Sequence, residues 1–195
     1  MSKIVQDIPH ANFIITRTVG AVWPPSFSHD PHIIPNIFSE MENGGPHVSI
    51  VFAQVDGYGV EIERTFFLGD IPEKAKDPFN VMYKAREIAY DLLKPGTIMS
   101  DVDKATRKYI TEKGYGDKII HRTGHGLGIT GHEAPFLAIG YDRKLEPGML
   151  ISVEPGIYIP GLGGFRHSDS VLITDDGYIK LTNAPEELDE VIIQL

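Results

Sequence analysis

Cysteine is absent from the 195 residues of the chain. This absence excludes disulfide bonds, thiolate zinc sites and a cysteine nucleophile together. It fits either a reducing compartment or a hot habitat and does not choose between them. Runs of lysine or arginine are missing too, and the formal net charge is −9. The charge balance therefore argues against nucleic acid or an anionic membrane as the main partner.

Long apolar runs are also lacking, since no stretch approaches the ~20 residues of a membrane span. Near the N-terminus, Asp7 and His10 stand where a secretory signal would be apolar. We therefore expect a cytoplasmic protein. With 42% hydrophobic and 23% charged residues, the sequence suits one compact domain over residues 1–195.

Alternating apolar and polar residues predict strands in the first and last thirds of the chain. We expect a strand over 12–22, followed by an irregular proline-rich loop, and a hairpin over 47–68 that turns near Asp56. In the second arm of that hairpin, Glu61, Glu63 and Thr65 share one face because side chains alternate along a strand. The segment 149–159 is typical of one long strand, and another hairpin follows it.

Two amphipathic helices are expected between these strand regions. Asp77 is placed to cap the first helix, with a proline in its first turn, and residues 94–96 stop it. The second helix is expected to begin with a weak capping box of Ser100 and Asp103 and to end at Gly114. The order of elements predicts an α+β fold, with helices packed on one face of an antiparallel sheet.

Several familiar motifs are incomplete here or lack the flanking sequence that their function requires. The glycines of 126–131 match a dinucleotide fingerprint as letters, but Pro135 follows them and no helical pattern does. His132 and Glu133 do not form a HExxH zinc helix because the second histidine is missing. A GxSxG nucleophile elbow and a phosphate-binding P-loop are both absent.

A cluster of polar residues in glycine-rich, strand-flanked positions remains. Three histidines occur within HRTGHGLGITGHEAP, and Glu154 stands in an apolar run where a buried carboxylate needs a cation or donors. The plain alternative is a surface loop with ordinary histidines and a solvated glutamate. The full set is His47, Glu61, His121, His125, His132, Glu133, Glu154 and Arg166.

The strings GHGLGITGHEAP and LEPGMLISVEPGIYIPGLGGFR, followed by a DDG turn, occur in that order. They resemble the catalytic domain of Xaa-Pro aminopeptidases and prolidases, in the methionine aminopeptidase superfamily. GYGVEIERTF and GGPHV resemble further motifs of the family, so the resemblance covers roughly residues 45–185. It implies the pita-bread fold. Residues 1–44 match weakly, so the first half of the fold is shortened or the chain is one piece of a longer protein.

The resemblance also implies where metal ligands should lie, because the family's hydrolases hold two divalent metals with two Asp, one His and two Glu. His125 and Glu154 match the histidine and one glutamate, and Glu61 stands in place of an aspartate. Ile50 and Ser168 occupy the other two carboxylate positions. We therefore expect no dinuclear centre and no cofactor. The alternative is a single divalent ion, Mn, Co or Zn, on Glu61, His125 and Glu154.

Residues that handle substrate and protons are implied by the same resemblance. His47 matches the histidine of the family's Pro-His segment, and His132 matches one that contacts substrate near the scissile bond. With Glu154, the histidines at 47, 125 and 132 form the implied catalytic set, while His121 and Arg166 are assigned to substrate binding. Creatinase, a relative with similar motifs, also lacks the metal carboxylates and hydrolyses a small C–N bond without metal.

Two functions follow from the resemblance. The first is an Xaa-Pro peptidase-like hydrolase that acts on a peptide or a small C–N bond without a dinuclear centre. The alternative is a non-catalytic pseudo-peptidase that binds peptides or proteins in the same cleft. The expected partner is a peptide or small-molecule substrate, with no nucleic acid and no membrane. Because members of the family pair, a homodimer is expected.

Overall fold

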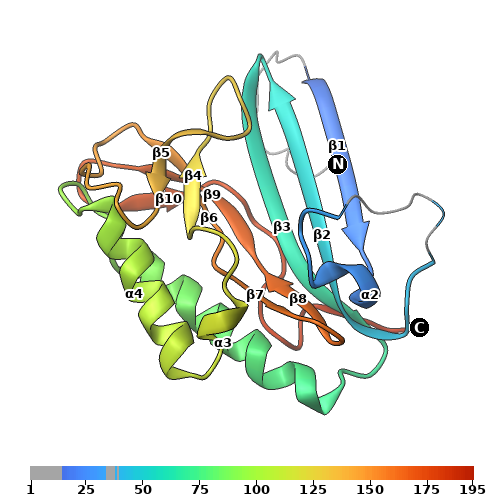
Figure 1. The fold of residues 1–195 in the computed structure, drawn as a ribbon. Coiled ribbons are helices and arrows are strands. Elements are labelled where there is room, and N and C mark those ends of the chain that lie inside the picture. The colour runs from blue at the N-terminus through green and yellow to red at the C-terminus, as the bar shows by residue number, and fades with distance from the viewer. Residues whose placement is uncertain (1–14, 34–37, 39) are drawn as a thin grey trace.

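A curled antiparallel sheet forms most of the molecule (Figure 1). The computed structural model describes residues 15–33, 38 and 40–195, so residues 12–14 of the first expected strand lie outside the described residues. Within these ranges the sheet has nine strands, seven of which lie on one path where neighbours run antiparallel. In order, the path is β1 (Ile15–Trp23), β2 (Gly44–Val55), β3 (Tyr58–Leu68), β9 (Ser168–Ile173), β6 (Leu150–Val153), β4 (Gly124–Gly126) and β5 (Glu133–Leu137).

Short strands complete this architecture. β10 (Tyr178–Lys180) pairs with β9, and β11 (Ile192–Ile193) runs parallel to β3. β7 (Gly156–Ile159) and β8 (Gly163–Arg166) form a separate two-stranded hairpin. The chain leaves the main sheet after β6 and returns to it at β9.

The helices lie on one side of the sheet, as Figure 1 shows for α3 (Glu73–Asp91) and α4 (Met99–Glu112). The expected α+β fold with helices on one face is therefore confirmed. A short α2 (Pro25–Ser28) follows β1, and a 3₁₀ turn, η1 (Gly116–Lys118), follows α4. No helix in the described ranges is both long and apolar enough to cross a membrane.

The hairpin of β2 and β3 forms as expected. Asp56 and Gly57 have φ angles of 49° and 84°, so both central residues of the turn are left-handed. Two such residues match the twist of the flanking strands. Gly114, which follows α4, also has a positive φ of 89°, and the expected end of that helix is confirmed.

Both expected helix starts were wrong. α3 begins at Glu73 rather than at Asp77, because Ala75 in the first turn is fully buried in the core and fixes that turn by packing. Asp77 accepts a hydrogen bond from the Tyr115 hydroxyl at 2.6 Å instead. α4 begins at Met99, so Ser100 already lies inside the helix, where its hydroxyl bonds the Asp142 carboxylate. Packing and long-range partners outweigh local capping signals here.

The segment expected as one long strand is two strands, β6 and β7, interrupted at Glu154 and Pro155. Proline has no N–H to give to a ladder, so the main sheet cannot continue through it. The interruption turns the chain from the main sheet into the β7–β8 hairpin. Glu154 therefore stands at the point where one sheet ends and the next begins.

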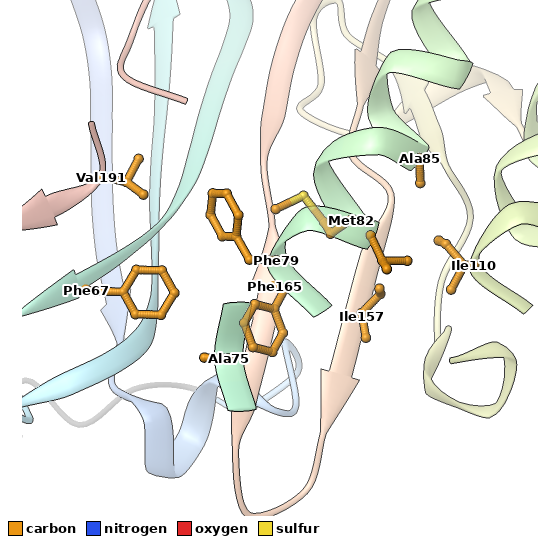
Figure 2. Close-up of a cluster of buried hydrophobic side chains, with 10 residues drawn as sticks. Phe67, Ala75, Phe79, Met82, Ala85, Ile110, Ile157, Phe165 and Val191 are labelled. Carbon is orange, nitrogen blue, oxygen red and sulfur yellow. The ribbon is translucent and has the colours of Figure 1, made fainter. Parts of the chain in front are cut away.

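A hydrophobic core joins α3 to the β7–β8 hairpin and to β3 (Figure 2). Phe67 of β3, Phe79 of α3 and Phe165 of β8 are each at most 1% exposed, and Phe67 and Phe79 lie with ring centroids 6.0 Å apart. Burying each such side chain contributes roughly 1.5–3 kcal/mol. Met82 of α3 and Ile157 of β7 belong to the same cluster and lie on the side of Phe79 and Phe165 away from Phe67 (Figure 2). The core thus fixes the hairpin that follows Glu154.

Candidate active site

A cavity of about 570 Å³ opens on the face of the sheet formed by β2 and β3. One wall comes from these strands, and another comes from the segment that leads into β4. The break after β6 and the end of β8 close the remaining side. The lining residues are Trp23, Pro31, His32, Ile50, Glu61, Glu63, Ile120, His121, Arg122, His132, Ala138, Glu154 and Arg166.

Strand alternation aims two carboxylates of β3 at this cavity. Glu61 and Glu63 are each 2% exposed, and Ile50 of β2 lies directly opposite Glu63 in the ladder. Paired residues of neighbouring strands point to the same face. Arg64 points the other way and donates to Asp169 at 2.7 Å on the far side of the sheet. The aspartate next to Ser168 is therefore directed away from the cavity, as strand alternation requires.

His125 of β4 lies between two carboxylates. Its Nδ1 is 3.0 Å from the Gly126 carbonyl oxygen and donates to it, which leaves Nε2 facing the cavity. Nε2 lies 3.2 Å from an oxygen of Glu154 and 3.5 Å from an oxygen of Glu61. Burial alone would lower the pKa of His125, but the nearby carboxylates of Glu154 and Glu61 raise that pKa to about 10.

The ring of His132 stacks on the ring of His125, with centroids 3.9 Å apart and planes inclined by 28°. His132 is exposed at the cavity, whereas His125 is buried beneath it. Burial, and next the positive charge of His125, lower the pKa of His132. The two histidines therefore differ in charge, because an imidazolium disfavours a second one in contact with it.

A buried ion pair forms the opposite side of the cavity. The Nε and Nη2 atoms of Arg166 in β8 each contact one carboxylate oxygen of Glu63, and Nη2 donates to it at 2.6 Å. Burial raises the pKa of Glu63 against the pull of Arg166, and the charge of Glu154 raises it further. Arg166 also donates to the Tyr158 hydroxyl at 3.0 Å. The guanidinium is thus committed to partners within the protein.

The Tyr158 hydroxyl links Arg166 to His121 by hydrogen bonds. The Nδ1 of His121 is 2.7 Å from the Arg122 carbonyl oxygen and donates to it, so Nε2 is free to accept from the Tyr158 hydroxyl at 2.6 Å. Burial lowers the pKa of His121, which favours this neutral form. His121 lines the cavity as an oriented, uncharged ring.

Asp103 of α4 holds both ends of the loop that carries the histidines. Its Oδ1 accepts from the backbone N–H and the hydroxyl of Thr123, at 3.0 and 2.7 Å. Its Oδ2 accepts from the N–H of Ile139 at 2.9 Å and from Arg107 at 3.0 Å. Four donors satisfy one buried carboxylate and fix where β4 and β5 begin and end.

The structure does not bring His47 to the cavity. His47 is buried on β2, stacks on Phe66 with centroids 5.0 Å apart, and accepts from the N–H of Glu42 at 3.2 Å. His32 lines the cavity instead. The other residues expected at the site, Glu61, His121, His125, His132, Glu154 and Arg166, all lie at or beside it.

His32, Glu63 and Tyr158 are among the residues of this site that were missed from the sequence. Pro31-His32 is a second Pro-His pair, and that repetition was a signal that could have found it. Glu63 shares a strand face with Glu61, which strand alternation already indicated. Tyr158 had no signal, because its partners His121 and Arg166 come from distant segments.

The donor set does not fit a dinuclear metal centre. Ile50 offers no lone pair, and Ser168 offers a neutral hydroxyl that already donates to Glu61 at 3.0 Å. Donors for one ion are present, but the set differs from the expected Glu61, His125 and Glu154. Ligand atoms of Glu61, His125 and His132 lie within 4.8 Å of one another, so His132 takes the place expected for Glu154. The buried Nε2 of His125 has no hydrogen bond of good geometry, as a metal-binding nitrogen would not.

Residues 25–175 match the model of metallopeptidase family M24. The chain is 43% identical, over 133 residues, to the Xaa-Pro dipeptidase of Lactobacillus delbrueckii subsp. lactis, and the match covers 68% of this chain and 36% of that protein. The structure of the Xaa-Pro dipeptidase from Bacillus anthracis superposes with a TM-score of 0.80 at 38% identity, covering 90% of this chain and 48% of the other. A prolidase from Thermococcus sibiricus gives a TM-score of 0.81 at 34% identity, covering 93% and 48%. The chain spans less than half the length of these relatives.

Proposed function

Because the chain belongs to metallopeptidase family M24, we propose that it hydrolyses a C–N bond of a peptide or small amide without a dinuclear metal centre. The reaction takes place in the cavity beside His125 and His132. The observation that carries the proposal is the stacked histidine pair, anchored from below by Glu61 and Glu154 and open to the cavity above. The Xaa-Pro dipeptidases and prolidases among its relatives support a peptide as substrate.

The absence of two carboxylates supports the metal-free part of the proposal. Two dications a few ångströms apart repel each other, so bridging and terminal carboxylates are needed to hold both. Ile50 and Ser168 stand where the resemblance expects two of them. Glu63 adds a carboxylate near Ile50, but Arg166 already neutralises it. The charges of this site are balanced by protein cations.

In the proposed reaction His132 is the group that meets water and substrate, because it is the exposed member of the pair. It takes a proton from water as the water oxygen bonds to the carbonyl carbon. The C–N bond then breaks, and His132 returns the proton to the departing nitrogen. His125, held by Glu61 and Glu154, keeps the His132 ring in place. A single divalent ion on Glu61, His125 and His132 would, when bound, polarise the carbonyl.

The test is hydrolysis of a panel of Xaa-Pro dipeptides, creatine and simple amides, followed by NMR before and after exhaustive chelation. We expect turnover that survives chelation and falls by roughly 100-fold or more in His132→Gln, because a general base contributes about 10²–10⁴-fold. His29→Gln is the matched control, since His29 does not line the cavity, and its turnover should be unchanged.

Two outcomes would replace this proposal. Activity that disappears on chelation and returns with one equivalent of manganese, cobalt or zinc would make the single-ion site the working one. Saturable binding of peptides with no turnover in any condition would favour the non-catalytic pseudo-peptidase. Elemental analysis of the purified protein distinguishes a specific single-ion site from nonspecific activation by added metal, because it counts the bound ions directly.

A further inference from the structure

The cavity contains a second arginine, Arg122, whose side chain forms no hydrogen bond or ion pair with any of the described residues. Arg122 lines the cavity beside His121, and its guanidinium lies over the ring of Phe136, 4.5 Å from the centroid. Its Nε is buried and makes no hydrogen bond with the part of the chain that the structure describes. Every other buried or half-buried arginine whose side chain is described pairs with a carboxylate: Arg64, Arg86, Arg107 and Arg166.

A buried donor without a partner is costly, and a guanidinium fork suits a carboxylate in particular. Phe136 holds this fork in place by a cation–π contact. In the ladder of β4 and β5, Phe136 lies directly opposite His125, so its ring belongs to the face that carries the histidines. The guanidinium of Arg122 is therefore presented on the same side as the histidine pair.

Arg166 cannot fill this role without breaking an existing ion pair. Its Nε and Nη2 contact the Glu63 carboxylate, and its Nη1 donates to the Tyr158 hydroxyl. A ligand carboxylate would have to displace Glu63, whose side chain is buried against Arg166 and 2% exposed. Arg122 requires no such displacement.

We propose that Arg122, rather than Arg166, binds an anionic group of the ligand, and that this group is the carboxylate of a short peptide. The inference rests on the proposed function for its choice of a peptide. Glu61, Glu63 and Glu154 already place three carboxylates at the cavity. A ligand with one negative charge is repelled less by them than a dianionic phosphate. Trp23 and Ile120 supply apolar surface for the rest of such a ligand.

The test compares glycyl-proline with glycyl-prolinamide, which differ only in the charge of the C-terminal group. Binding is measured by calorimetry and by NMR of the arginine Nε–H signals. We expect the acid to bind at least tenfold more tightly than the amide, because a charged hydrogen bond is at stake. Arg122→Gln should remove that difference, and Arg122→Lys should keep part of it. Arg143→Gln, at an exposed arginine outside the cavity lining, is the matched control and should behave as the native protein.

Each outcome bears on one proposal or the other. Equal binding of acid and amide by the native protein, or unchanged discrimination in Arg122→Gln, overturns the Arg122 site and leaves the hydrolase proposal standing. If neither peptide binds but acetate still shifts the Arg122 signal, the anion site stands and the peptide function fails. An Arg122 signal that responds to acetate no more than to inorganic phosphate removes the preference for a carboxylate, and no response to any carboxylate overturns the site.

Discussion

Glu63 and Arg166 form an ion pair in the wall of the cavity, and both side chains are buried. Removing one partner of a buried pair leaves an uncompensated charge and costs about 3–5 kcal/mol. We expect Arg166→Met to lower the free energy of unfolding by that amount in urea titrations. The double variant Glu63→Gln with Arg166→Met should lose less than the sum of its two single variants, because the buried charges are removed together.

An exposed pair provides the control for this measurement. Lys104 donates to Asp101 at 2.9 Å on the outer surface of α4, and both side chains are more than half exposed. Lys104→Gln should change the free energy of unfolding by less than about 0.5 kcal/mol. A loss below about 1 kcal/mol in Arg166→Met would contradict the expectation and indicate that water reaches the Glu63 carboxylate.

At the residue scale, the sequence places five of the ionisable residues that line the cavity, Glu61, His121, His132, Glu154 and Arg166, but not their partners. Short motifs find His125, Glu154 and Arg166 because glycine and proline fix the local backbone around them. The choice between His47 and His32 cannot be made locally, since both follow a proline and only the path of the chain between β1 and β2 decides which one reaches the cavity. Ion pairing of Glu63 depends on β8 meeting β3, which no local pattern encodes.

Among the elements, the link between β8 and β9 carries a histidine that must stay neutral. His167 is fully buried, accepts from the N–H of Thr65 at 3.1 Å through Nδ1, and donates through Nε2 to the Glu186 carbonyl at 3.1 Å. Burial, and next the charges of Arg86 and Arg64, lower its pKa to about 3. The unfolded value is about 6.5, so stability is complete above that pH and is lost as pH falls toward 3.

This histidine predicts a measurable slope. Between pH 6 and pH 4 the native protein should lose about 1.4 kcal/mol per pH unit through His167, beyond what its carboxylates contribute. His167→Gln keeps an amide that can donate and accept but cannot take up a proton in this range. Urea titrations at pH 7, 6, 5 and 4 should show a shallower slope for the variant. Parallel curves for the two proteins would assign the acid sensitivity to other groups.

Element types were more predictable than element boundaries. The β2–β3 hairpin and the end of α4 follow from Asp56, Gly57 and Gly114, whose backbone conformations are local properties. The start of α3 and the break between β6 and β7 were not predicted correctly. Ala75 is fixed by core residues far away in sequence, and Pro155 interrupts a pattern whose apolar residues are buried in two different sheets.

For the whole molecule, the order of motifs along the chain was enough to predict the architecture. The curled antiparallel sheet with few helices matches the pita-bread fold of prolidases, and the chain covers 48% of each of the two compared structures. Order and spacing are informative here because each motif sits where one strand ends or turns. The weakly matched N-terminal region offered no such anchors.

Association between copies belongs to this scale as well. β1 ends the path of the sheet, and its outer edge pairs with no strand among the described residues. An open strand edge presents unpaired backbone donors and acceptors that another chain can use. The homodimer expected from the family stays a prediction. Sedimentation equilibrium should give twice the mass of 21.6 kDa at micromolar concentrations, and a single monomeric species at millimolar protein would contradict it.

The four hydrogen bonds that Asp103 accepts have a consequence for changing this protein's specificity. They fix the two ends of the histidine loop, at Thr123 and Ile139, to helix α4, whereas Ile129 at its tip is 72% exposed. The Ile129 side chain can therefore be varied while Thr123 and the Asp103 carboxylate are retained, whereas a Cβ at Gly128 or Gly131 would lie 2.2 Å from Glu133 or 2.7 Å from Phe52. A graft that replaces the whole loop between Thr123 and Ile139 would lose these anchors, and with them the backbone positions that stack His125 on His132.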